Sequence, residues 1–458
     1  MPEAIPPVSP TRMGHNLRRR PLRDTGRVRL PDLRPGDRVA LLTPGSATYL
    51  DVVLGLLGEG VVPIPLDPRL TAVERERILG PLSPALRVED DEVLAAVAER
   101  FPRVPGRLPR ARPMHCTSGT TGVPKGVWSG LLDDAAAAAL VAEERDLWGF
   151  AADDVNLVLS PLYHSAPLRF ATGTLLVGGR VVIPGPFDPA TVTAAIERDR
   201  PTTMFCVPTH LQRLFAHWDA VGTPDLSCFR LVAHAGAPCP RELKERLIAT
   251  FPPGTTWEFY GSTEGQFTAC RSEEWQQRPG TVGRARPGRE LSVDDDGLIW
   301  CVVPEHARFS YWGAPEKTAA AWRETPSGPA FTVGDLGRLD ADGYLHFDGR
   351  REDLVITGGV NVYPLEVEEA LREHPDVADV AVLGVDDPQW GQRVCAAVVP
   401  RSDAATAESL GAFARERLAP PKRPKTWLLV DDLPRTLTGK VRRDDLRALL
   451  EGPPQQAN

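Results

Sequence analysis

The chain has 458 residues, of which 42% are hydrophobic and 25% charged, a composition typical of a globular protein large enough for two or more domains. Its net charge of −8 gives no overall basic field, so composition does not favour a nucleic-acid partner. No apolar stretch is long enough for a membrane span or a secretory core, and we expect a cytoplasmic protein. The cysteines stand singly, without a Cys-x-x-Cys pair, which favours free thiols over disulfides or a zinc site.

The predicted elements begin after an arginine-containing segment, residues 1–35, which we expect to be a flexible lead-in. From Arg38 to Tyr260, short β-type runs alternate with helical patterns. This alternation predicts a large α/β domain of layered sheets and helices over residues 36–349. The predicted strands are 38–42, 61–66, 155–159, 180–183, 204–207, 231–234 and 257–260. The predicted helices include 51–57, 71–79 and 240–251.

The pattern changes after Thr281 to short strands separated by the turn dipeptides Asp296-Gly297 and Asp342-Gly343, which predicts a β-rich subdomain of hairpins. We place a domain boundary at 349–353, where a charged cluster lies. A small α+β domain is predicted over residues 350–451. Its predicted elements are helices at 364–373 and 406–418 and strands at 377–383 and 394–399.

A hydroxyl-rich and glycine-rich run, Thr117 to Gly126, is suited to binding a polyphosphate. Glycines let backbone N–H groups approach an anion closely, Thr and Ser donate hydrogen bonds, and Lys125 adds a positive charge. The spacing differs from a Walker A loop. The candidate phosphate-binding residues are Thr117, Ser118, Gly119, Thr120, Thr121, Gly122 and Lys125.

Other polar segments follow predicted strands. Tyr260 to Gly265 offers an aromatic ring, hydroxyls and the carboxylate of Glu264, a group that can hold Mg²⁺ against phosphate oxygens. Asp335 ends a Phe-Thr-Val-Gly-Asp segment and offers a carboxylate for ribose hydroxyls. Near the C-terminus, Lys440 follows a glycine. Each segment alone is also compatible with a polar turn, a solvated linker or a surface lysine.

Together and in this order, the segments resemble the adenylate-forming superfamily of acyl-CoA synthetases, firefly luciferase and nonribosomal-peptide adenylation domains. The resemblance covers about residues 38–449, and the segments around His234 and Trp275 are most similar to bacterial fatty-acyl-CoA-ligase-like members. Relative to ordinary members, the N-terminal portion of the large domain is short.

The resemblance implies ATP, Mg²⁺ and coenzyme A as cofactor and co-substrates, and assigns roles to the motif residues. Glu264 would bind Mg²⁺ and Thr263 the α-phosphate, while Asp335 and Arg350 would hold the ribose. Lys440 would bridge the substrate carboxylate and the α-phosphate as the acyl adenylate forms. The adenine would lie between Tyr260 and the segment Gly236, Ala237 and Pro238.

The resemblance also implies two half-reactions. The small domain would rotate about Glu352, the hinge, to replace the lysine loop by the Gly358-Gly359 face before coenzyme A attacks the adenylate. His164, in the segment 161–165, would lie near the reacting carbonyl, although a purely structural histidine is the alternative.

The acid is not defined by sequence. The pocket walls are expected from segments 168–170, 206–209, 234–237 and 266–268. Polar or basic residues there argue against a simple long-chain fatty acid, and an aromatic acid or a short polar one fits equally well. These residues are His164, Arg169, His210 and His234.

Three functions follow from the sequence. The leading one is ATP-dependent formation of an acyl-CoA from a small-molecule carboxylate, by a monomer or homodimer. The second keeps adenylation but changes the acid or acceptor, as in amide formation or nitrite activation for diazotisation of an aryl amine. The third is a non-catalytic nucleotide sensor or scaffold, which loss of Lys440 or Glu264 would have favoured.

Overall fold

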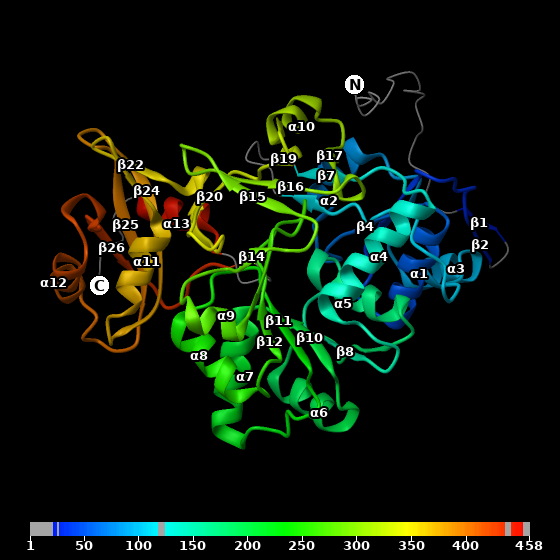
Figure 1. Cartoon of the computed structure of the whole chain (residues 1–458), viewed down its shortest axis with the longest axis horizontal. Helices are drawn as coiled ribbons and strands as arrows, with labels where there is room; N and C mark the ends of the chain where they lie inside the picture. The colour runs from blue at the N-terminus through cyan, green and yellow to red at the C-terminus, as the bar shows by residue number, and fades with distance from the viewer. Residues whose placement is uncertain (1–21, 25–26, 118–123, 436–440, 452–458) are drawn as a thin grey trace.

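The computed structural model describes residues 22–24, 27–117, 124–435 and 441–451. Figure 1 shows the α/β layers of the N-terminal portion, coloured blue to green, on one side and the C-terminal portion, coloured yellow to red, on the other. The α/β architecture expected from sequence is confirmed. No helix within the described ranges is long and apolar enough to cross a membrane.

The N-terminal layer is a parallel sheet in the order β4-β3-β5, formed by β3 Arg38–Leu41, β4 Val62–Pro65 and β5 Leu86–Val88. Its helices are α1 Ala47–Gly58, α2 Ala72–Leu82 and α3 Asp91–Arg100. Within the expected lead-in, β1 Leu22–Asp24 pairs with β2 Arg27–Arg29. Val28, Leu30 and Leu33 pack against the same core as this sheet, so this part of the lead-in contacts the domain.

The central sheet has the order β14-β13-β12-β11-β10-β8-β9. Its parallel strands are β8 Val155–Val158, β9 Arg180–Val182, β10 Thr203–Cys206, β11 Leu231–His234 and β12 Thr256–Glu258. Its antiparallel strands are β13 Thr268–Arg271 and β14 Arg284–Ala285.

Helices cover both faces of the central sheet, as expected for parallel strands whose residues are buried on both sides. Met204 and Val232 pack in one core with α6 to α8, whereas Phe205 and Ala233 face a second core that contains Trp148. The period-2 alternation of each strand explains this division. The helices are α4 Asp134–Trp148, α5 Ser165–Leu176, α6 Pro189–Asp199, α7 Pro208–Val221, α8 Arg241–Thr250 and α9 Ser272–Gln277.

The β-rich part follows. One sheet has the order β15-β16-β19-β18 and another the order β17-β7-β6, while β20 pairs with β21. The hairpins expected at Asp296-Gly297 and Asp342-Gly343 are present as the turns of β15-β16 and β20-β21. The bounds are β6 Cys116–Thr117, β7 Lys125–Trp128, β15 Glu290–Val293, β16 Ile299–Val302, β17 Ser310–Tyr311, β18 Trp322–Thr325, β19 Gly328–Phe331, β20 Asp335–Leu339 and β21 Leu345–Arg350, with η1 Glu305–Ala307 and α10 Pro315–Ala321.

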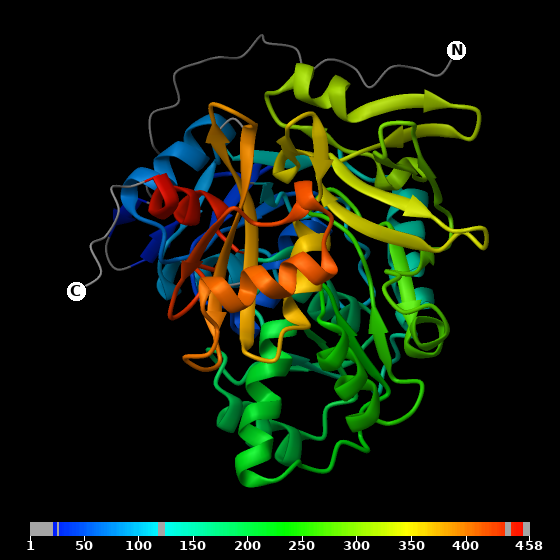
Figure 2. The ribbon, with the colours of Figure 1, turned by 90° about the vertical axis from the view of Figure 1, so that its left-hand side faces the viewer.

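The C-terminal unit, which faces the viewer in Figure 2, begins after the 3-10 turn η2 Arg351–Asp353. Its sheet has the order β23-β22-β25-β24, with β26 beside β25. Helices α11 and α12 pack on one face and Leu446 of α13 on the other. The bounds are β22 Val355–Thr357, β23 Val360–Val362, α11 Pro364–Arg372, β24 Val377–Asp387, β25 Gly391–Pro400, α12 Ala407–Arg417, η3 Pro420–Lys422, β26 Thr426–Leu429 and α13 Arg443–Glu451.

Candidate active site

The ends of parallel strands bring two predicted site segments to one edge of the central sheet. Cys206, His234 and Glu258 are in register on β10, β11 and β12. The chain therefore leaves β11 and β12 on the same edge, where open α/β sheets bind ligands. The segments that follow are residues 236–238 and 260–265.

The turn after β12 has a compact shape that only glycine allows. A Cβ on Gly261 would lie 2.9 Å from both the Cα of Gln266 and the carbonyl oxygen of Gly265. Ser262 donates its backbone N–H to the Gly265 oxygen at 2.8 Å, and its hydroxyl accepts from the Glu264 N–H at 3.2 Å. This turn holds the Glu264 side chain beneath the sheet edge, 6% exposed.

Tyr311 orients Glu264. Its hydroxyl donates to Oε1 of Glu264 at 2.8 Å. Burial, followed by the charge of Glu264, raises the pKa of Tyr311 above its ordinary range, so the phenol keeps the proton that it donates. The second carboxylate oxygen of Glu264 has no hydrogen bond from a described residue, which fits a role as a cation ligand.

The structure tests whether the residues fit Mg²⁺. Among the described residues there is no group of three or more His, Cys, Asp and Glu side chains that could hold a metal. A Mg²⁺ ion bound to Glu264 would therefore take its other ligands from phosphate oxygens and water, as is usual for nucleotide-bound magnesium. The single oriented carboxylate fits this kind of site.

The ends of the phosphate-loop candidate lie next to the same group. Thr117 pairs with Lys125 across β6 and β7. Strand β7 also pairs with β17, where Val127 lies opposite Tyr311. The strand that leaves the loop is thus hydrogen-bonded to the strand that orients Glu264. The predicted residues Ser118, Gly119, Thr120, Thr121 and Gly122 lie outside the described residues.

Tyr260, Asp335 and Arg350 form a second group. The Tyr260 hydroxyl donates to Oδ2 of Asp335 at 2.5 Å, and Nε of Arg350 lies 3.3 Å from Oδ1. Asp335 and Arg350 are opposite each other in the β20-β21 hairpin. The Tyr260 ring stacks on Phe267 with centroids 4.9 Å apart and lies 5.3 Å from the tilted ring of Phe347.

The remaining predicted site residues belong to neither of these two groups. His164 is the N-cap residue of α5, with its ring 4.5 Å from that of Tyr163. Glu352 lies in η2, and its carboxylate accepts from Arg350 at 3.2 Å. Lys440 lies outside the described residues, as does the rest of 436–440, whereas Arg435 and Val441 on either side form a β-bridge.

A cavity of about 120 Å³ opens beside this edge, between α4 and α5 (Figure 1 labels both helices). Thr263, Gly265 and Gln266 line it from the turn, and Ser165 lines it next to His164. Of the expected walls, Leu168, Arg169 and Gln266 line the cavity, but segments 206–209 and 234–237 do not.

Two of the histidines expected near the acid lie elsewhere. His210 stacks on Phe187 at 4.2 Å, and His234 is fully buried with its Nε2 2.6 Å from Nζ of Lys244. Both histidines are structural in these positions. His234 ends β11, and its side chain points into the interior because alternate side chains of a strand point to opposite faces of the sheet, whereas His210 lies in the first turn of α7.

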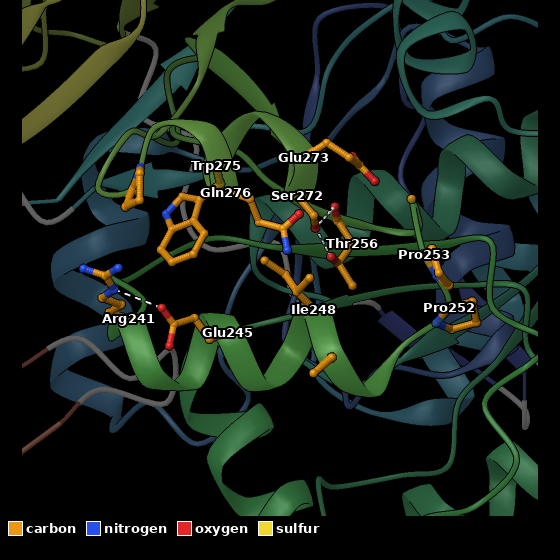
Figure 3. A pocket seen from close by; sticks show the side chains of 13 residues that line it. Arg241, Glu245, Ile248, Pro252, Pro253, Thr256, Ser272, Glu273, Trp275 and Gln276 are labelled. Atoms are coloured by element: carbon orange, nitrogen blue, oxygen red, sulfur yellow. Dashed lines mark hydrogen bonds and ion pairs between the residues drawn. The ribbon is translucent and has the colours of Figure 1, made fainter.

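A larger hollow of about 600 Å³ lies between α8 and α9 (Figure 3). In Figure 3, Arg241 and Glu245 pair on one rim, and Thr256 and Ser272 bond at the far end. None of the predicted site residues that the structure describes lines this hollow, so size alone does not identify the functional pocket.

The comparisons agree with the motifs. Residues 114–300 match the model of AMP-binding enzymes, and residues 366–440 match the model of the AMP-binding enzyme C-terminal domain. A feruloyl-CoA synthase from Amycolatopsis sp. is 35% identical, over 94% of this chain and 92% of that protein. The chain belongs to the AMP-binding enzymes.

Solved structures of AMP-binding enzymes share the fold. The o-succinylbenzoate CoA synthetase of Bacillus subtilis, in complex with its acyl-adenylate intermediate, has a TM-score of 0.77 and 26% identity, over 91% of this chain and 89% of that one. An amide bond synthetase from Marinactinospora thermotolerans has a TM-score of 0.75 and 29% identity, over 91% and 90%.

Sequence reasoning missed a cluster of charged residues in this AMP-binding enzyme. The cavity is also lined by Arg112, Glu143, Glu144, Arg286 and Arg289. The one visible signal is the Glu-Glu pair that interrupts an alanine-rich helix at its buried end. Which side chains those glutamates meet depends on residues more than a hundred positions away, which no local pattern reports.

Proposed function

We propose that this protein is an AMP-forming acid–CoA ligase, which activates a carboxylic acid with ATP and transfers the acyl group to coenzyme A. The observation that carries the proposal is the meeting, at one sheet edge, of the Tyr260–Asp335–Arg350 group, the Tyr311–Glu264 pair and the ends of the phosphate-loop candidate. The relatives named as CoA ligases support it.

In the proposed ATP site, each of these groups binds a different part of the nucleotide. Asp335 and Arg350 bind the ribose, and Tyr260 packs against the adenine, opposite residues 236–238. Thr263 and the loop from Thr117 to Lys125 bind the phosphates through N–H, hydroxyl and ammonium donors. Glu264 holds Mg²⁺, which when bound neutralises part of the phosphate charge.

In the first half-reaction, an oxygen of the acid forms a bond to the α-phosphorus, and the bond from that phosphorus to the leaving pyrophosphate breaks. Two anions must approach each other, so positive charge near them lowers the barrier. Lys440 supplies that charge between the carboxylate and the α-phosphate.

In the second half-reaction, the thiol sulfur of coenzyme A bonds to the acyl carbon as the carbon–oxygen bond to AMP breaks and the thiol proton is released. His164 lies beside the reacting carbonyl. Rotation at Glu352 withdraws the lysine loop and brings the 358–359 face to the site. A cytoplasmic location and a monomeric or homodimeric state remain predictions.

The test is pyrophosphate release from ATP and Mg²⁺ across aliphatic and aromatic carboxylic acids, each with and without coenzyme A. We expect one class of acid to trigger release, and coenzyme A to accelerate it with formation of a thioester. Absence of release with every acid would overturn the proposal and favour a nucleotide sensor.

The second candidate is ligation to an amine, favoured by the similarity to an amide bond synthetase. Replacing coenzyme A by a panel of amines in the same assay tests it. Faster turnover with an amine than with coenzyme A, and an amide product, would favour this function. An arm with nitrite and aryl amines tests the diazotisation alternative.

A further inference from the structure

A cluster of charged side chains, here called the arginine cluster, lines the inner part of the cavity between α4 and α5. Two carboxylates of α4, Glu143 and Glu144, face guanidinium groups that arrive from three other parts of the chain. The members of the cluster are Arg112, Glu143, Glu144, Arg169, Arg286 and Arg289.

The two carboxylates are occupied by neighbours. Nη2 of Arg286 lies 3.0 Å from an oxygen of Glu143 and 3.0 Å from an oxygen of Glu144. Arg289 also pairs with Glu143, whose other oxygen is 2.7 Å from Nε2 of His306. Burial would raise the pKa of Glu143, but these neighbours outweigh it and hold the pKa at about 2. Both glutamates are ionised near neutral pH, and neither is available to attract a cation.

Neither of the remaining guanidinium groups has an ion-pair partner as close as those of Arg286. Arg169 forms a longer ion pair with Glu144, at 3.6 Å, and bonds to the hydroxyl of Ser165 at 3.3 Å. Arg112 makes no hydrogen bond or ion pair with any residue in the described ranges, although it is half-buried. Burial lowers the pKa of Arg112 to about 10, so it stays charged near pH 7.

Positive charge is therefore in excess inside the cavity. Among the described residues that line the cluster, the guanidinium groups of Arg112, Arg169, Arg286 and Arg289 face only the two carboxylates. The side chain of Arg286 is 1% exposed and that of Arg289 6% exposed, so water screens little of this charge. An uncompensated buried charge is costly unless a ligand pairs with it.

The buried polar atoms of the cavity lining that make no hydrogen bond are all donors. In the described part of the chain, Nε of Arg286, Nε of Arg289 and Nε2 of Gln266 are buried and make no hydrogen bond. Gln266 is 2% exposed and its Oε1 accepts from Arg286, which fixes its amide N–H group as a donor toward its surroundings. A ligand that satisfies these atoms must offer acceptors, and the charge excess requires a negative one.

The cavity joins these donors to the reaction site. Thr263 and Gly265, in the turn that holds Glu264, line the same cavity as the arginine cluster, and apolar side chains such as Leu168 and Val141 also line it. An acid whose reacting carboxylate lies at the turn would therefore have charged donors and apolar side chains around the rest of its body.

We propose that the acid substrate carries a second anionic group, a carboxylate at its remote end, which the arginine cluster binds. The inference rests on the proposed function and narrows it from carboxylic acids in general to dicarboxylic acids with an apolar spacer. Arg112 and Arg169 are the principal ligands of the remote carboxylate, because they lack a close ion-pair partner, and Arg286 and Gln266 donate further hydrogen bonds.

The first experiment uses matched pairs of probes with the full-length protein. Aliphatic and benzene dicarboxylic acids of increasing length are compared with their monomethyl esters, and simple monocarboxylic acids are added as a third set. We expect the best dicarboxylic acid to exceed its monoester by about 10- to 100-fold in kcat/KM for pyrophosphate release, the range of one or two charge-assisted hydrogen bonds.

The outcomes separate the inference from the proposed function. Equal use of monoesters, or better use of monocarboxylic acids, would overturn the dicarboxylate inference and leave the ligase intact. No pyrophosphate release with any acid would overturn both. Thermal stabilisation by the diacids but not by the monoesters, without ATP, is expected and does not depend on turnover.

A variant of Arg112 tests whether the preference for diacids over monoesters comes from the arginine cluster. Arg112→Gln should raise KM for the diacid at least 10-fold, leave KM for the monoester within about threefold, and leave Tm unchanged or higher because an unpaired charge is removed. Arg110→Gln is the matched control, since Arg110 lies two residues away and pairs with Asp134 at 2.5 Å on the surface. An equal loss with diacid and monoester, or a lower Tm with no change in their ratio, would assign Arg112 a structural role and overturn its part in recognition.

Discussion

Glu264 shows how one site residue depends on a distant one. Its orientation comes from Tyr311, which lies 47 positions further along the chain and reaches it only because β17 pairs with β7. A neutral phenol that donates to a carboxylate oxygen fixes the direction of the other oxygen. The role proposed for Glu264 as a Mg²⁺ ligand therefore extends to Tyr311 as a positioning residue.

Tyr311→Phe should weaken Mg²⁺ binding without abolishing activity. We expect the Mg²⁺ concentration for half-maximal pyrophosphate release to rise about three- to tenfold, which corresponds to the net contribution of one hydrogen bond, about 1 kcal/mol. Glu264→Gln should raise this Mg²⁺ concentration by a much larger factor. Tyr344→Phe is the control, since Tyr344 bonds to Glu274 instead. A Mg²⁺ dependence unchanged in Tyr311→Phe would contradict the positioning role.

Buried neutral histidines predict acid sensitivity of the fold. Burial lowers the pKa of His115 to about 3 and that of His210 to about 4, compared with about 6.5 in an unfolded chain. Between these values the unfolded chain binds more protons than the folded one. The folded state therefore keeps its full stability with respect to these two histidines above pH 6.5. As the pH falls from 6.5 toward the folded pKa, the free energy of unfolding decreases by roughly 1.4 kcal/mol per pH unit for each histidine.

His210→Phe should remove one part of this pH dependence. Urea denaturation between pH 7 and pH 5 should show a shallower loss of unfolding free energy in the variant than in the parent protein. His217→Gln, on the same helix, is the control and should retain the parent slope. A variant slope equal to that of the parent would show that His210 is not protonated on unfolding in this range.

Helix α4 has two roles along its length. Its N-terminal half is alanine-rich and begins at the N-cap Asp133, which accepts from the Ala136 N–H at 2.8 Å. Its C-terminal half carries Glu143 and Glu144 into the protein, where they meet the loop after β14 and η1. The helix thus connects the arginine cluster with the β-rich part.

Glu143→Gln should destabilise the protein strongly. The substitution leaves the guanidinium group of Arg289 and the ring of His306 without their carboxylate and leaves Arg286 with Glu144 alone. Removal of one partner from a buried pair costs about 3–5 kcal/mol. Urea denaturation at pH 7 measures the loss of unfolding free energy, with Glu305→Gln on the exposed turn η1 as the control. A loss below about 1 kcal/mol would show that the cluster is solvated in the folded state.

The whole molecule divides at η2. Strand pairings of the described residues on each side of Arg351–Asp353 join only strands of the same side. The pair of Arg443 with Asp353, at 3.2 Å, joins η2 to the C-terminal unit. This arrangement is compatible with the proposed hinge at Glu352, because rotation there would leave every sheet intact.

Glu352→Pro should separate the half-reactions. Proline stiffens the backbone at the hinge, so we expect pyrophosphate release in single turnover to stay within about threefold of the parent, while thioester formation slows at least 10-fold. Glu352→Ala is the control for loss of the carboxylate. Lys440→Ala should give the reverse pattern, with adenylation lost and thiolation of a supplied adenylate retained. Equal loss of both steps in Glu352→Pro would contradict the hinge.

The sequence by itself determined the layered α/β architecture, the two hairpins and the elements α11, β24, β25 and α12 of the C-terminal unit, because periodicity and turn residues act locally. It also determined the membership in the adenylate-forming superfamily, since motifs such as Tyr260 to Glu264 are continuous in the chain. The roles given to individual motif residues stay predictions.

Only the tertiary structure decided what lines the cavity that we propose for the acid. His210 and His234 lie in the interior away from the cavity, whereas Arg112, Arg286 and Arg289 line it. No periodic pattern connects α4 with a loop more than 140 positions later. Buried charges pair according to the packing of whole elements, so the charge of the pocket is a property of the fold and not of any one segment.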